Sequence, residues 1–187
     1  IVTEIVPNEG TIGQVGMSVN DAKAILDGFV MDTWLANYDA VGTGLDNVVV
    51  GNDGKIYRID QGGSLFFRAQ GKLKDASVLN NADPNQYYDK NDYYRKVFDT
   101  AGTKPKELDP TAFFKSLDDT IKKEGGIESW LTSMYGRMHD EIVANGGTVP
   151  PEVKGADLQK YAELLSTRLN GLKKAYGYES KPVKETQ

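Results

Sequence analysis

The chain has 187 residues, enough for one domain with its own hydrophobic core, and 39% of them are apolar. Its net charge of −5 argues against a general nucleic-acid binder, and the lack of any run of eighteen apolar residues argues against a membrane span. Because the chain has no cysteine and only His139 as histidine, disulfides, thiolate metal sites and zinc sites of several histidines are excluded.

The first seventeen residues are predicted to form an extended entry segment with loops. Pro7 and three glycines interrupt each short apolar run, and no glycine-rich phosphate-loop pattern occurs among them. The chain begins with Ile1 and not with Met, so we expect a processed product or a part of a longer protein.

The next segment, from Ser18 to about Ala36, is predicted to be a helix. Ser18 can cap its N-terminus, with Asp21 three residues later. Apolar side chains then recur at helical spacing, at Ile25, Leu26, Phe29, Val30 and Trp34.

A β-hairpin is predicted from two strand-like runs, residues 47–50 and 55–59. The sequence GNDG between them supplies residues that tolerate a positive φ in a tight turn. Residues 61–92 are polar and rich in Asp, Asn and Gly, which indicates a long loop. A loop of this length in a compact domain is usually functional or mobile.

Three helices are predicted in the C-terminal half. The first begins at Asp109 and Pro110, and the second and third carry apolar residues over 127–142 and 158–172. The expected fold class is therefore mainly α with a small β-hairpin (α+β). We expect one domain over residues 18–179, between the entry segment 1–17 and a disordered tail over 180–187.

Three oxygen-bearing side chains are expected to gather at the open end of the hairpin. Asn47 begins the first strand and Asp60 follows the second, so the two should lie side by side, with Asp39 close by. Asn and Asp supply the hard oxygen ligands that suit Mg²⁺ bound to phosphates. A second Asp can accept the proton of an attacking hydroxyl, or orient that hydroxyl.

Three short stretches around these residues resemble the large lobe of the protein-kinase-like fold. They are WLANYD (34–39), DNVVV (46–50) and RIDQGG (58–63), and the last is similar to the Ile-Asp-x-Gly of lipid-kinase-like and HipA-like enzymes. The longer string over residues 32–74 resembles a kinase-like segment of bacterial and phage-encoded effector or virion-associated proteins.

This resemblance implies a phosphotransferase that uses ATP and Mg²⁺ on a protein or a small hydroxyl substrate. Asp39 would be the catalytic residue, Asn47 and Asp60 the metal ligands, and Gly62 part of the cofactor site. It also implies a cytoplasmic or virion-associated protein that acts on a protein substrate or an assembly partner. No nucleic acid or membrane is expected as a partner, because of the net charge and the lack of a long apolar run noted above.

No glycine-rich strand pair and no lysine-bearing strand precede residue 18, so the small lobe of such a fold is not expected in this chain. An upstream segment or another protein chain would have to supply it. The alternative is a non-catalytic kinase-like module with an interaction or structural role. A plain helical binding domain with a purely structural hairpin also stays open, because Asn and Asp are common at hairpin ends.

Several other polar or aromatic residues have a functional and a structural interpretation. The basic residues Arg68, Lys72 and Lys74 could contact a phosphate or the substrate, but a solvated loop is the commoner arrangement. The tyrosine-rich residues 86–98 suggest a contact surface, or half-packed loop and helix. His139 is expected on the surface. Core positions are expected for the two tryptophans, Trp34 and Trp130.

Overall fold

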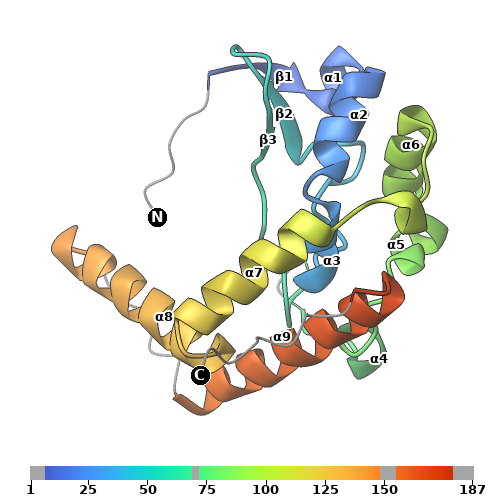
Figure 1. Cartoon of the computed structure of the whole chain (residues 1–187). Coiled ribbons are helices and arrows are strands. Elements are labelled where there is room, and N and C mark those ends of the chain that lie inside the picture. Colours follow the sequence, from blue (N-terminus) through green and yellow to red (C-terminus); the bar gives the residue numbers. More distant parts are fainter. Residues whose placement is uncertain (1–6, 69–71, 148–154, 179–187) are drawn as a thin grey trace.

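The computed structural model describes residues 7–68, 72–147 and 155–178. The tail predicted for residues 180–187 and the first six residues of the entry segment lie outside these ranges. The elements in chain order are β1 (Asn8–Thr11), α1 (Ile12–Val15), α2 (Val19–Leu26), α3 (Phe29–Trp34), β2 (Val48–Gly51), β3 (Ile56–Arg58), α4 (Ala76–Leu79), α5 (Asn85–Lys90), α6 (Asp92–Ala101), the 3₁₀ turn η1 (Pro105–Glu107), α7 (Thr111–Lys123), α8 (Ile127–Ala144) and α9 (Gly155–Ala175) (Figure 1).

The described chain is mainly helical with one small antiparallel sheet, which confirms the predicted mainly-α, α+β class. The sheet has the strand order β1-β2-β3, so the entry segment adds a third strand to the predicted hairpin. Thr11 of β1 lies opposite Val49 of β2. An extended conformation was expected for the entry segment, but its pairing with β2 was not, because pairing between distant segments leaves no local signal in a glycine-interrupted sequence.

The predicted hairpin is confirmed, with Val48 paired to Arg58 and Val50 paired to Ile56. In the turn, Gly54 has a φ of 75°, and its N–H donates to the Gly51 carbonyl at 2.8 Å. Gly54 is the GNDG residue that takes a positive φ, a conformation that glycine adopts without steric cost.

The predicted helix over residues 18–36 is split into α2 and α3. Ser18 caps α2 as expected, through a reciprocal pair of hydrogen bonds with Asp21. The helix breaks at Gly28 because the Arg58 guanidinium lies there and donates to the Ile25 carbonyl at 2.6 Å. A side chain at Gly28 would meet that guanidinium at 2.4 Å.

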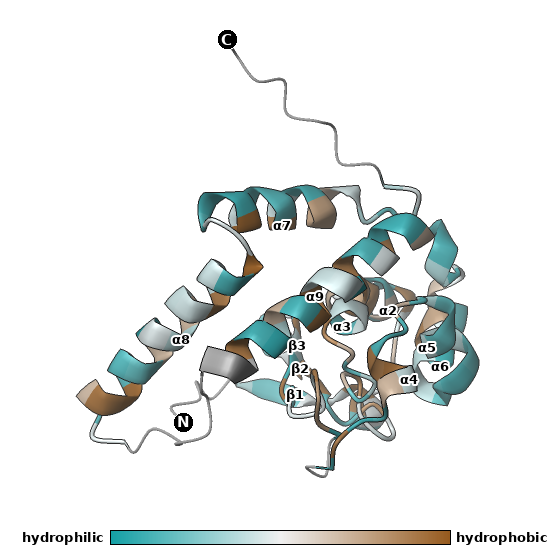
Figure 2. Cartoon of the chain, turned by 90° about the horizontal axis from the view of Figure 1, so that it is seen from below, coloured by the Kyte–Doolittle hydropathy of each residue, from teal (hydrophilic) through white to brown (hydrophobic). Residues whose placement is uncertain are grey.

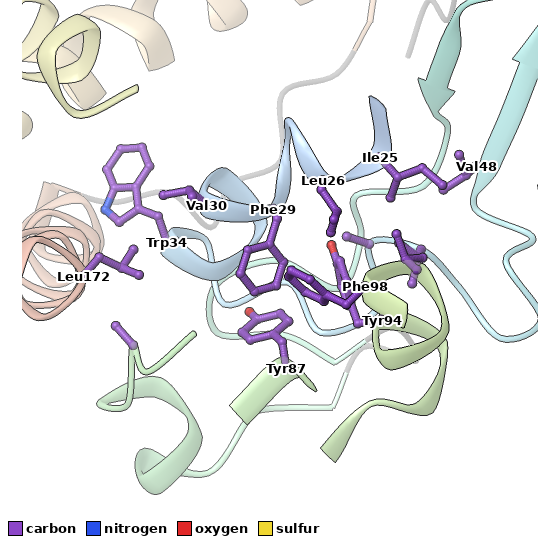
Figure 3. Close-up of a cluster of buried hydrophobic side chains, with 14 of the residues drawn as sticks. Ile25, Leu26, Phe29, Val30, Trp34, Val48, Tyr87, Tyr94, Phe98 and Leu172 are labelled. Atoms are coloured by element: carbon purple, nitrogen blue, oxygen red, sulfur yellow. The ribbon is translucent and has the colours of Figure 1, made fainter. Parts of the chain in front are cut away.

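The centre of the core is the aromatic ring of Phe29. It makes edge-to-face contacts with Tyr87, Tyr94 and Phe98, at centroid distances of 5.6, 5.3 and 4.8 Å (Figure 3). These partners belong to α5 and α6, so the prediction of a continuous loop over 61–92 was wrong for α4 and α5. The tyrosine-rich residues 86–98 are half-packed, as one of the two interpretations expected: Tyr87, Tyr94 and Phe98 face Phe29, whereas Tyr88 and Tyr93 are only partly buried.

Helix α9 lies against α3 (Figure 1), and a buried arginine of α9 ties it to the end of α3. Arg168 is fully buried and donates to the carbonyls of Thr33 and Trp34 at 2.5 and 2.7 Å. It also donates to carbonyls at the end of α4, among them Leu79 at 2.5 Å. In return, the Trp34 indole N–H donates to the Leu165 carbonyl at 2.9 Å. One side chain thus closes two helix ends whose last carbonyls have no partner within the helix.

Helices α7 and α8 extend to one side of the remaining elements, away from α5 and α6 (Figure 2). Trp130 of α8 stacks on Trp34 at 6.2 Å but is only partly buried, whereas Trp34 is core as predicted. His139 is exposed on α8, as expected. Within the ranges described above, none of the helices combines the length and apolar character needed to cross a bilayer.

Replacing Arg168 with Met is expected to lower the free energy of unfolding by about 3 kcal/mol, because buried carbonyls at the ends of α3 and α4 lose their donor. Arg137→Met on α8 is the control. Its side chain is exposed and donates to the Ser133 hydroxyl within its own helix at 2.7 Å, so a change within about 0.5 kcal/mol is expected. Urea denaturation followed by circular dichroism measures both. Equal losses in the two variants would contradict the role given to Arg168.

Candidate functional site

The open end of the hairpin brings two of the predicted site residues together. The Asn47 carbonyl accepts a hydrogen bond from the Ile59 N–H at 3.1 Å, so strand pairing continues beyond β2 and β3 to this end. Asp60 follows Ile59 directly. Its carboxylate accepts the N–H of Gly62 at 2.8 Å, which fixes the start of the following loop.

Asp39 lies beside this pair. The Asn47 side-chain amide donates to the Asp39 backbone carbonyl at 2.7 Å. Partial burial, followed by the negative charges of Asp60 and Asp46, raises the pKa of the Asp39 carboxyl above its ordinary value, while the Asn47 amide lowers it. The predicted trio of Asp39, Asn47 and Asp60 therefore interacts within one site.

The raised pKa of Asp39 has a defined sign for stability. The folded chain holds the Asp39 proton more tightly than the unfolded chain, so stability decreases as the pH rises through the raised pKa. The ionised form of Asp39 is therefore less favourable in the folded chain than in the unfolded chain. Burial is the largest cause of the raised pKa of Asp39, and a cation beside Asp39 and Asp60 would relieve the second contribution, the charge repulsion.

The loop between Asp39 and Asn47 is anchored in the core. Val41 and Leu45 are buried, and the Gly42 N–H donates to the Asp39 carbonyl at 2.9 Å. Gly42 has a φ of 72°, and a Cβ there would lie 2.0 Å from an Asp46 carboxylate oxygen and 2.7 Å from the Asn47 backbone nitrogen. The loop is a packed turn that needs glycine at position 42.

Backbone strain concentrates around the site. Across the described residues, the non-glycine residues with positive φ are Ala36, Leu45 and Leu65, with values of 53°, 65° and 53°. Ala36 lies two residues after the end of α3 and three before Asp39, Leu45 lies two before Asn47, and Leu65 follows Gly62 in the same loop. Such residues persist only where the surrounding structure holds them, and they gather at functional sites.

A positioning residue that the sequence did not reveal is Asn37, which is fully buried. Its amide nitrogen donates to the Gln61 side chain at 2.8 Å, and its amide oxygen accepts the Asp39 N–H at 3.2 Å. Asn37 thus joins the segment of Asp39 to the segment of Asp60. A single Asn after a predicted helix has no periodic or motif signal that could have identified it.

A cavity of about 380 Å³ opens beside Asp39, and Arg68, Lys74 and Lys90 also line it. The expectation that the basic residues of this loop are solvated holds for Lys72 and Arg68, which are exposed. It was wrong for Lys74, which is only 9% exposed because its ammonium is folded under the loop.

The oxygen-bearing side chains at the open end of the hairpin can be compared with the ligand requirements of a metal ion. Across the described ranges, no group of three or more His, Cys, Asp or Glu side chains could enclose one. Asn47 and Asp60 offer one amide oxygen and one carboxylate at the open end. This small set of hard oxygen ligands fits Mg²⁺, which takes few protein ligands and completes its shell with phosphate oxygens and water.

Comparison with protein families, curated proteins and solved structures finds no match for this chain.

Gly42→Ala is expected to destabilise the fold by about 2 to 4 kcal/mol, because it adds a positive-φ penalty to a clash with Asp46 and Asn47. Gly44→Ala is the matched control, since Gly44 has a φ of 77° and a Cβ added there would enter open space. It should cost only the backbone term, about 1 kcal/mol. Chemical denaturation separates the two values, and equal costs would show that the packing around Gly42 is not tight.

Proposed function

We propose that this chain is the large lobe of a kinase-like phosphotransferase that transfers a phosphoryl group from Mg²⁺-bound ATP to a hydroxyl. The observation that carries the proposal is the junction of Asp39, Asn47 and Asp60: a hydrogen bond joins the first two, and the charge of Asp60 acts on the Asp39 carboxyl. The resemblance of the surrounding segments to kinase-like enzymes assigns the same three residues to the site.

Asn47 and Asp60 would hold the Mg²⁺ ion through the side-chain amide oxygen and the carboxylate. When bound, Mg²⁺ neutralises charge on the β- and γ-phosphates of ATP. The hydrogen bond from the Gly62 N–H keeps one Asp60 carboxylate oxygen fixed. The Asn47 amide nitrogen is held by the Asp39 carbonyl, so the amide oxygen is turned to the opposite side.

Asp39 is the proposed base. In the transfer, the acceptor hydroxyl oxygen forms a bond to the γ-phosphorus, and the bond from that phosphorus to the bridging oxygen of ADP breaks. ADP leaves with the electron pair, and the hydroxyl proton passes to the Asp39 carboxylate. A raised pKa suits this role, because a base is most effective when its pKa lies close to the working pH.

A small lobe from an upstream segment or another protein chain would complete the adenine site under this proposal. The large-lobe chain alone is then expected to bind Mg²⁺-ATP weakly, with a dissociation constant in the millimolar range, on the order of −4 kcal/mol. Weak binding by the isolated chain is measurable and does not depend on turnover.

In a thermal unfolding assay, Mg²⁺ and ATP together at about ten times the dissociation constant are expected to stabilise the chain by about 1.4 kcal/mol, a shift of a few degrees. Asp60→Asn should abolish this shift, because it removes the charge that holds the ion. Asp53→Asn is the control, since Asp53 carries its carboxylate at the opposite end of the same hairpin and pairs with Lys55.

The proposal fails if Mg²⁺-ATP stabilises the wild type and Asp60→Asn equally. It fails also if no stabilisation occurs at any concentration, which would leave the non-catalytic module as the better account. Asp39→Asn should keep the Mg²⁺-ATP shift, because Asp39 acts on the hydroxyl. It should lose phosphoryl transfer once the small lobe is present, by about two to four orders of magnitude.

A further inference from the structure

A buried lysine lies in the wall of the cavity beside Asp39. Lys74 donates from its ammonium to the carbonyls of Gly63 and Leu65, at 2.5 and 2.8 Å. These two bonds hold the charged group under the loop that follows Asp60. Burying an ammonium group costs free energy unless the group is paired with a negative charge, so the charges around Lys74 indicate whether the cavity favours an anion.

The charged side chains that act on the pKa of Lys74 are both positive. Burial, and then the charges of Arg168 and Arg68, lower the pKa of Lys74 to about 8. Within the described part of the chain, no carboxylate is paired with Lys74 or with Arg168. Arg68 is paired with Asp75 at 2.9 Å, but both side chains are largely exposed. Lys74 and Arg168 are thus buried close together without the counter-charge that buried cations ordinarily have.

The lining of the cavity has a net positive charge. Arg68, Lys74 and Lys90 are its cations, and Asp39 is the one carboxylate among its described lining residues, so three positive charges face one negative charge. Asp75 pairs with Arg68 from outside the lining and reduces this excess from two charges to one. The remaining positive charge favours an anion such as a phosphate monoester, which would compete with the exposed Asp75 for Arg68. A volume of about 380 Å³ suits a small molecule and lies at the low end for ligand sites.

The cavity is distinct from the proposed metal pair. Neither Asn47 nor Asp60 is among its described lining residues, whereas Asp39 is. Asp39 therefore stands where the two regions meet, with the Asn47 amide on its carbonyl and the cavity at its side. This is the arrangement expected for a base that receives a proton from a molecule in the cavity.

We propose that this cavity binds a small phosphomonoester that carries a free hydroxyl, with its phosphate on Lys74 and Arg68 and its hydroxyl toward Asp39. The role of this molecule as the acceptor rests on the proposed function, and the binding of the phosphate does not. As acceptor, it would receive the γ-phosphoryl group on its hydroxyl oxygen and give the hydroxyl proton to Asp39, so that the products are a bisphosphate and ADP.

The test is isothermal titration calorimetry of the chain with glycerol 3-phosphate, without nucleotide or Mg²⁺, and with glycerol as the uncharged probe. Glycerol 3-phosphate should bind and glycerol should not. Lys74→Met should weaken binding by about tenfold or more, since a charged hydrogen bond is lost. Lys90→Gln changes an exposed position on the rim of the cavity and should weaken the binding of glycerol 3-phosphate by about threefold. This variant tests the proposal if Lys74→Met does not fold.

Lys96→Gln is the matched control, because it removes the same charge from the exposed face of α6, outside the cavity. Its binding of glycerol 3-phosphate should equal that of the wild type. Equal losses in Lys96→Gln and in the cavity variants would overturn the proposal, since binding would then reflect overall charge. Undiminished binding in the cavity variants, or tighter binding of a phosphoserine peptide with none of glycerol 3-phosphate, would overturn it too.

The anion site and the proposed function can fail separately. Asp60→Asn should lose the effect of Mg²⁺-ATP and keep glycerol 3-phosphate binding. Binding of glycerol 3-phosphate without any binding of Mg²⁺-ATP would leave the anion site standing and remove the proposed function. The anion site would be overturned if the wild type does not bind glycerol 3-phosphate and Lys74→Met no longer binds Mg²⁺-ATP. The cavity would then be part of the nucleotide site.

Discussion

The hydrogen bonds of the buried Arg168 guanidinium to helix-end carbonyls are the interaction on which the rest of the structure depends. The guanidinium reaches from α9 to the last carbonyls of α3 and α4, so the three helices share one fixed point. The segment that leads to Asp39 begins where α3 ends, and the loop that carries Lys74 leads into α4. Arginine suits this place because its planar guanidinium has five donors and stays charged when buried. The position of the site therefore follows from a contact outside the site.

The charges around Asp39 are arranged against the stability of the isolated chain. Asp60 and Asp46 act on Asp39 on one side, and Arg68 and Arg168 act on Lys74 on the other. Like charges held close together raise the free energy of the fold, and a bound partner of opposite charge lowers it again. We therefore expect a cation to bind beside the carboxylates and an anion to bind in the basic cavity. Each expectation has its own test.

Local patterns in the sequence predicted local structure well. The cap at Ser18, the turn at Gly54 and the three C-terminal helices depend on neighbouring residues, and their signals are local too. The break between α2 and α3 depends on Arg58, which comes from the hairpin, so periodicity could not show it. In the site, strand alignment predicted the trio of oxygen-bearing side chains. The burial of Lys74 and the bridging role of Asn37 depend on tertiary contacts and could not be predicted.

The most direct test of the central claim, that Asp39, Asn47 and Asp60 form one Mg²⁺-phosphate site, is the pKa of the Asp39 carboxyl measured by ¹³C NMR. The account predicts a value above the ordinary one without Mg²⁺, and a decrease when Mg²⁺ and ATP are added or when Asp60 is replaced by Asn. An ordinary pKa that responds neither to Mg²⁺-ATP nor to Asp60→Asn would contradict it.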